Sequence, residues 1–236
     1  MTKLGIIGAM QVEVEILLGA MENKTSLEKA GCTFYEGVLK GLPAVVVQCG
    51  VGKVNAAMCT QVLCDLFQVT HLVNTGIAGS LCADLDIGDL VVSSDAMYHD
   101  MDAVHFGYPM GKVPGMDVTA FPADCHLMDY AYAAAEEVNP GHTKIGRVAS
   151  GDQFVAVKAV KERIISVTNG LCTEMEGAAI AQTAYRNGLP FVILRAISDK
   201  ADDSAEMDYP TFERIAAHRC ADVTMRLAKQ LKNAQE

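Results

Sequence analysis

The sequence predicts an α/β protein whose largely parallel sheet is covered by helices on both faces. Segments with the apolar pattern of strands alternate with segments of helical spacing along the whole chain. The expected strands are apolar on both faces, which is typical of a parallel sheet buried between helices. The chain has 236 residues, 50% of them hydrophobic, which is enough for a sizeable core. Since no repeat, linker or low-complexity tract divides it, we expect one domain over residues 1–236.

The expected strands are short apolar runs that end at glycine, proline or polar residues. A Gly-Leu-Pro turn separates the second from the third. In chain order they lie at 3–8, 34–39, 43–48, 71–75, 89–93, 144–149 and 190–197. The fourth and fifth are joined by a small-residue loop at 76–80. Because ligands of such sheets bind beyond the carboxyl ends of strands, polar residues just after a strand are candidate site residues.

The expected helices repeat apolar residues every three to four positions. In chain order they lie at 12–20, 52–67, 123–138, 177–187 and 210–232. Residues 95–122 show no clear period and contain several aromatic and histidine side chains. A loop of this length in a compact domain is usually functional or covered by a partner.

Charge and hydropathy exclude several classes of partner. Lysine and arginine number 19 against 29 acidic residues, so the formal net charge is −10. A chain this acidic disfavours nucleic acid and anionic membrane surfaces as partners. No apolar run reaches the roughly 18 residues that cross a bilayer, and the N-terminal apolar stretch is too short for a signal peptide. We expect a cytoplasmic protein.

The cysteines and histidines predict neither disulfides nor a metal site. None of the eight cysteines has Cys-x-x-Cys spacing, and none of the six histidines pairs with a cysteine at zinc-ligand spacing. In a cytoplasmic chain such cysteines act as small buried apolar residues. We therefore expect free thiols, no metal and no cofactor.

Three glycine-rich turns follow strands, at 5–10, 50–53 and 76–79. The first lacks the third glycine of the dinucleotide fingerprint. The second resembles part of a phosphate loop, but Val54 stands where serine or threonine should follow the lysine. Each turn alone indicates a tight backbone turn rather than a ligand site.

Carboxylates at the expected strand ends are more informative. Glu13 lies near the start of the first helix, Glu176 at a strand-to-helix junction, and Asp199 at the end of a strand that also carries Arg195. Read singly, Glu13 and Asp199 could be helix caps, and Glu176 with Arg195 a structural ion pair. Together they favour a site.

Two acids in one pocket suit the cleavage of a glycosidic bond. One acid must protonate the leaving group, and another must activate water. An acid at an apolar strand end has its ionised form disfavoured, which raises its pKa. Asp199 could then donate a proton near neutral pH.

Five segments occur together in the order found in one known family: 5–10 (GIIGAM), 73–76 (VNTG), 150–152 (SGD), 174–179 (EMEGAA) and 195–199 (RAISD). With Glu13 in place, the chain resembles the bacterial 5′-methylthioadenosine/S-adenosylhomocysteine nucleosidases of the nucleoside phosphorylase superfamily, essentially from end to end. The resemblance implies a three-layer α/β/α fold with a mixed central sheet, usually in a homodimer. It also implies cofactor-free hydrolysis of the adenine N-glycosidic bond in 5′-methylthioadenosine, S-adenosylhomocysteine and 5′-deoxyadenosine.

The resemblance also implies roles for individual residues. Asp199 would protonate N7 of the departing adenine, Glu13 would deprotonate the attacking water, and Glu176 would bind the ribose hydroxyls. Substrate contacts would further come from Met10, Val51, Ile77, Phe154, Val155, Met175, Arg195, Ser198 and Tyr209. Phe106, Tyr108 and Pro114 match positions that reach into the neighbouring subunit's pocket.

The chain departs from the family pattern at a few positions. Gln11 and Val12 replace acids before the catalytic glutamate, and Ile77 replaces a common serine or threonine near the water site. Tyr209 stands where phenylalanine is common, and its hydroxyl suits a polar 5′ group. Which adenine nucleoside is favoured stays open.

Three alternative functions compete with this hydrolase. A nucleoside phosphorylase would use phosphate, which needs several cationic or backbone donors. Arg195 is the only arginine at an expected strand end, and the segment after Met10 is acidic, so charge favours water. An aminodeoxyfutalosine hydrolase would share the same acids. A non-catalytic nucleoside-binding protein would not need all three of them.

Overall fold

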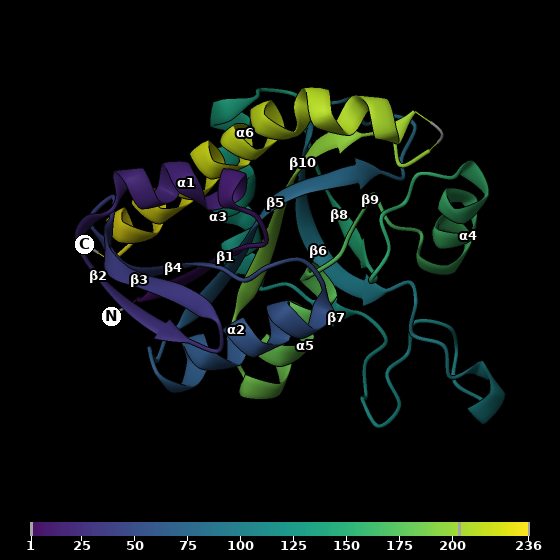
Figure 1. The fold of residues 1–236 in the computed structure, drawn as a ribbon, viewed down its shortest axis with the longest axis horizontal. Coiled ribbons are helices and arrows are strands. Elements are labelled where there is room, and N and C mark those ends of the chain that lie inside the picture. The colour runs from purple at the N-terminus through teal and green to yellow at the C-terminus, as the bar shows by residue number, and fades with distance from the viewer. Residues whose placement is uncertain (1, 203, 236) are drawn as a thin grey trace.

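The structure, a computed structural model, describes residues 2–202 and 204–235. Helices cover both faces of a sheet and make three layers, as predicted (Figure 1). The helices are α1 (Gln11–Ala20), α2 (Lys53–Asp65), α3 (Cys125–Val138), α4 (Lys158–Thr168), α5 (Gly177–Asn187), α6 (Ala205–Asn233) and the short 3-10 helix η1 (Val104–Phe106). The strands are β1 (Leu4–Gly8), β2 (Glu22–Lys29), β3 (Cys32–Leu39), β4 (Leu42–Gln48), β5 (His71–Ser80), β6 (Leu90–Tyr98), β7 (Phe121–Pro122), β8 (Thr143–Ser150), β9 (Cys172–Glu174) and β10 (Phe191–Asp199).

The sheet is mixed, as predicted, and part of it closes on itself. Its strand order is β10-β6-β8-β9-β5-β1-β4-β3-β2, with β7 beside β6. Because β10 also pairs with β5, the strands from β10 through β6, β8 and β9 to β5 form a ring. β1 runs parallel to β4 and β5, β10 to β5, and β8 to β6 and β9, whereas the remaining pairs are antiparallel.

Two apolar cores lie on the two faces of the sheet. Successive residues of a strand point to opposite faces, so Ile6 and Val192 belong to one core while Ile7 and Ile193 belong to the other. The first core packs against α1, α3 and α6, and the second against α2 and α5 (Figure 1). This explains why the expected strands are apolar on both faces.

Several elements differ from the sequence-based expectation. Residues 76–80, expected as a loop, continue β5 as buried strand. β6 runs on to Tyr98 and β7 adds two residues, so the irregular part of 95–122 is shorter than expected. β2, β9 and α4 were not anticipated. Helix α6 begins at Ala205 rather than at Pro210, which lies inside it.

Two findings concern membranes and thiols. Within the described residues, no helix is long and apolar enough to span a bilayer. All eight cysteines are free, as expected, and four of them are buried.

The topology places the ends of several strands next to one another. β1 and β10 flank β5 in parallel, so their carboxyl ends meet at one edge, and β9 pairs with the last residues of β5. A register shift between Ile197 and Asp199 sets Asp199 beside Gly79. The polar residues that follow these strands therefore converge.

Candidate active site

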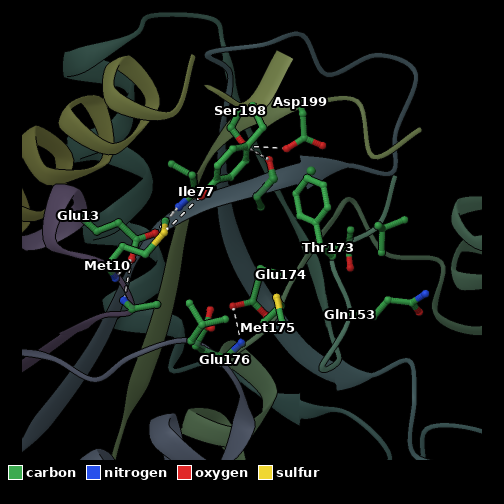
Figure 2. A pocket seen from close by; sticks show the side chains of 17 residues that line it. Met10, Glu13, Ile77, Gln153, Thr173, Glu174, Met175, Glu176, Ser198 and Asp199 are labelled. Carbon is green, nitrogen blue, oxygen red and sulfur yellow. Dashed lines mark hydrogen bonds between the residues drawn. The ribbon is translucent and has the colours of Figure 1, made fainter. Parts of the chain in front are cut away.

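A cavity of about 410 Å³ opens at this edge of the sheet (Figure 2). Eleven sequence-predicted site residues line it: Met10, Glu13, Val51, Ile77, Phe154, Val155, Met175, Glu176, Ser198, Asp199 and Tyr209. In Figure 2, Asp199, Glu13 and Glu176 border one space from different sides. The three acids that the sequence predicts to act together therefore share a single cavity.

Glu13 is held by backbone donors at the start of α1. Its Oε2 accepts the N–H groups of Ala9 at 2.6 Å and Met10 at 2.9 Å, and its Oε1 accepts that of Ile77 at 3.1 Å. Burial raises the pKa of the carboxyl, while Arg195 and these donors oppose the shift. The helix-cap interpretation of Glu13 is confirmed, and the same side chain also faces the cavity.

Arg195 is buried behind the cavity rather than lining it. Its guanidinium forms an ion pair with Glu174, donates to Asn74 Oδ1 at 2.5 Å, and lies 3.8 Å from Glu176 Oε2. One cation thus neutralises part of a cluster of carboxylates. Gly76 leaves room for this, because a Cβ there would overlap both Arg195 and Glu13.

Glu174 is a functional residue to which sequence reasoning assigned no role, although it is the first acid of the quoted EMEGAA segment. It lines the cavity, binds Arg195 and accepts the backbone N–H of Gly177 at 2.7 Å, in the first turn of α5. The available signal was its place in that segment, two residues before Glu176 at the expected strand-to-helix junction. Its carboxylate fixes Arg195 and the start of α5 together.

Glu176 belongs to this cluster and faces the cavity. Its Oε1 accepts the N–H of Gly52 at 2.8 Å, and Gly52 is the N-cap residue of α2 with φ of +100°, a conformation that favours glycine. Burial raises the pKa of Glu176 to about 7, Glu174 adds to the shift, and Arg195 opposes it. The carboxyl therefore exchanges its proton near neutral pH.

Asp199 ends β10 and is 3% exposed. Its Oδ2 accepts the hydroxyl of Ser198 at 2.8 Å, and its Oδ1 accepts the N–H of Ala201 at 2.8 Å. Burial raises the pKa of Asp199, although both hydrogen bonds act against the rise. This is the environment in which an aspartic acid can keep a proton to donate.

Two aromatic rings line the same cavity. The rings of Phe154 and Tyr209 meet edge to face with centroids 5.5 Å apart, and Phe154 is 48% exposed. An exposed ring at the rim of a cavity offers a stacking surface to a flat base.

The three residues expected to serve a neighbouring subunit do not line the cavity of their own chain. Phe106 and Pro114 are exposed, and Tyr108 is half-buried, all within the irregular segment after β6. Phe106 is 84% exposed, which is unusual for a phenylalanine.

The part of the chain that the structure describes contains no cluster of potential metal ligands. Within residues 2–202 and 204–235, no group of three or more His, Cys, Asp or Glu side chains could hold a metal ion.

Comparison with known proteins gives the family. The model of the phosphorylase superfamily matches residues 3–229. A 5′-methylthioadenosine/S-adenosylhomocysteine nucleosidase of Halalkalibacterium halodurans is 42% identical, over 98% of this chain and 100% of the relative. The chain belongs to the 5′-methylthioadenosine/S-adenosylhomocysteine nucleosidase family. The resemblance that the sequence motifs indicated is thereby confirmed.

Solved structures agree with this family. The nucleosidase of Neisseria meningitidis in complex with methylthio-immucillin-A has a TM-score of 0.94 and 35% identity, covering 98% of this chain and all of that one. A futalosine hydrolase of Helicobacter pylori strain 26695 is also similar, with a TM-score of 0.92 and 32% identity over 97% and 98% of the two chains. The nucleosidase fold is thus shared with an enzyme named for a different nucleoside.

Proposed function

We propose that the chain hydrolyses the N-glycosidic bond between adenine and ribose in 5′-methylthioadenosine, S-adenosylhomocysteine and 5′-deoxyadenosine, and releases adenine. The observation that carries this proposal is the sharing of one cavity by Asp199, Glu13 and Glu176, each with a pKa raised by burial. Relatives named for two of these substrates support the choice of nucleoside.

In the proposed reaction, the bond between C1′ of the ribose and N9 of adenine breaks. Asp199 donates its proton to N7, so that adenine leaves as a neutral base. The ribosyl group becomes positively charged in the transition state, and the glutamates near it stabilise that charge. Interactions that strengthen as the charge develops lower the barrier more than interactions with the ground state.

Water completes the reaction by attack at C1′. Glu13 takes the proton of this water, and backbone donors from two segments hold the Glu13 carboxylate in place. Glu176 binds the ribose hydroxyls, and Met175 packs on the sugar. Arg195 keeps Glu174 and Glu176 in position from behind the cavity.

At the base side, Phe154 stacks on adenine and the backbone of Val155 reads its edge. Ser198 orients Asp199 through the hydrogen bond to Oδ2. Four further lining residues, Met10, Val51, Ile77 and Tyr209, enclose the sugar and the 5′ substituent.

Charge favours water over phosphate as the nucleophile. Among the described residues that line the cavity there is no lysine or arginine, and Arg195 is already engaged by Glu174. A phosphate ion would need several such donors. The test is adenine release from a panel of adenine nucleosides with and without phosphate. Strict dependence on phosphate would refute hydrolysis.

The similar futalosine hydrolase favours one second candidate, hydrolysis of aminodeoxyfutalosine. That nucleoside carries the same base, so the acids described above would act on it in the same way. Including it in the substrate panel decides between the two, because kcat/KM ranks the competing nucleosides directly.

We propose further that the chain acts as a homodimer in which Phe106, Tyr108 and Pro114 complete the cavity of the partner subunit. The exposed apolar side chains of Phe106 after β6 and of Val54 and Met58 on α2 support an interface with another subunit. Light scattering at micromolar concentration tests this, and a monomer would refute it.

Free thiols suit a reducing compartment, and we propose a cytoplasmic location.

A further inference from the structure

Tyr209 brings a hydroxyl to an otherwise apolar side of the cavity. It lies in the second turn of α6, with its hydroxyl oxygen 3.3 Å from Met10 Sδ and 3.1 Å from Glu213 Oε1. Met10 and Phe154, whose ring centroid lies 5.5 Å from that of Tyr209, are uncharged lining residues in contact with it. The tyrosine therefore links the apolar wall to a carboxylate that stands just outside it.

Glu213 lies one turn beyond Tyr209 and is partly exposed. Within residues 2–202 and 204–235, it has no ion-pair partner, although it accepts the tyrosine hydrogen bond. Glu15, also at the contact of α1 with α6, differs in this respect, since it pairs with His218 at 3.1 Å and Arg214 at 3.7 Å. The negative charge of Glu213 is thus oriented but not neutralised.

The proposed function fixes which part of the substrate faces this wall. In the proposed function, Asp199 and Phe154 hold adenine and Glu176 binds the ribose hydroxyls. The wall formed by Met10, Val51, Ile77 and Tyr209 then faces the sugar and the 5′ substituent. The thioether sulfur and methylenes suit the apolar side chains. Beyond them, an ammonium group would meet a carboxylate whose position a tyrosine already fixes.

We propose that Glu213, oriented by Tyr209, recognises the ammonium group of an amino-acid-bearing 5′ substituent and so raises the preference for S-adenosylhomocysteine over 5′-methylthioadenosine. The inference rests on the proposed function and adds a specificity residue to it. A partly exposed ion pair has a modest effect, so the expected change in the ratio of kcat/KM values is about twofold to fivefold.

The test compares wild type with Glu213→Gln on three substrates: S-adenosylhomocysteine, 5′-methylthioadenosine and a homocysteinyl analogue that lacks the amino group. The substitution keeps the side-chain size and removes the charge. We expect the S-adenosylhomocysteine to 5′-methylthioadenosine ratio of kcat/KM to fall about twofold to fivefold, mainly through KM. The ratio for the analogue should stay constant.

Glu15→Gln is the matched control, because it removes a carboxylate from the same contact of α1 with α6 and should leave the ratio unaltered. Tyr209→Phe should lower the ratio in the same direction as Glu213→Gln. An unaltered ratio in Glu213→Gln would overturn the inference. So would a raised ratio, which would mean that Glu213 repels the carboxylate of the substrate, or an equal loss with the analogue lacking the ammonium.

The failure of this inference can be told apart from that of the proposed function. If wild type releases no adenine from either natural substrate, the proposed function is wrong. If it releases adenine from both and the Glu213→Gln ratio matches wild type, only the specificity role is wrong.

Discussion

Replacing Asp199 with asparagine removes the proton that the proposed reaction gives to adenine. Asparagine has nearly the same shape, and its side-chain oxygen can still accept from Ser198 or Ala201. The cavity should therefore keep its form. General acid catalysis contributes roughly 10²–10⁴-fold to a rate, so kcat should fall by that factor, equal to about 3 to 5 kcal/mol in the barrier.

The assay is release of adenine from 5′-methylthioadenosine under saturating and limiting substrate, with binding of a non-hydrolysable analogue measured in parallel. We expect kcat to fall while affinity for the analogue stays within a few fold of wild type. If Asp199→Asn kept more than about a tenth of the activity, the general-acid role would be refuted.

Ser198→Ala gives this prediction a second readout. Burial raises the pKa of Asp199, so the rate should be lost as pH rises through that raised pKa, where the acid ionises. The Ser198 hydroxyl opposes the rise by stabilising the ionised form. Its removal should therefore move the falling limb of the kcat profile to higher pH. A limb that moves to lower pH would contradict the assignment.

Further predictions concern the other carboxylates, the nucleophile and the loop. Glu13→Gln should slow single-turnover cleavage at least about 10²-fold while the analogue still binds, and unchanged single-turnover rates would refute its role as base. Because the pKa of Glu176 is raised to about 7 by burial, the folded state holds a proton that the unfolded state loses above about 4.5. Stability should thus fall by up to about 3 kcal/mol as pH rises from 4.5 to 7, and urea unfolding of Glu176→Gln should show a weaker dependence on pH. Adding phosphate should leave the rate of adenine release unaltered. Phe106→Ala should raise KM severalfold if the side chain serves a partner's cavity, and an unaltered KM would argue against that.

Asp199 and Glu13 could be predicted from sequence because each comes at or soon after the end of a strand that its own residues reveal. The end of β10 was visible as an apolar run closed by Ser198 and Asp199, and Glu13 as an acid in a first helical turn. Parallel pairing of β10 and β1 with β5 then brings these ends together.

The missed elements carry weak local signals. Every residue of β2 is exposed, so the strand has no apolar face to detect and depends on pairing with β3. Residues 76–80 are small and glycine-rich, which favours a loop, yet pairing with β10 and β9 holds them extended. Pro210 is expected at the start of a helix, and α6 accommodates it one turn later.

The role of Glu174 was harder to predict from sequence than the roles of the other acids in the site. Its neighbours in sequence do not reveal that Arg195 reaches it from β10, which lies on the other side of β5 in the ring of strands. Likewise, the contact of Tyr209 with Glu213 depends on helix α6 starting before Pro210, which the sequence does not indicate.

Buried Arg195 on β10 creates a conflict between the stability of the fold and the activity of the site. Removing Arg195, Glu174 and Glu176 from water costs more free energy than burying apolar side chains of equal volume. Replacing all three with apolar residues such as leucine should therefore give a more stable protein without activity. Attempts to engineer heat resistance into this protein should therefore target the outer helices and leave this dehydrated cluster intact.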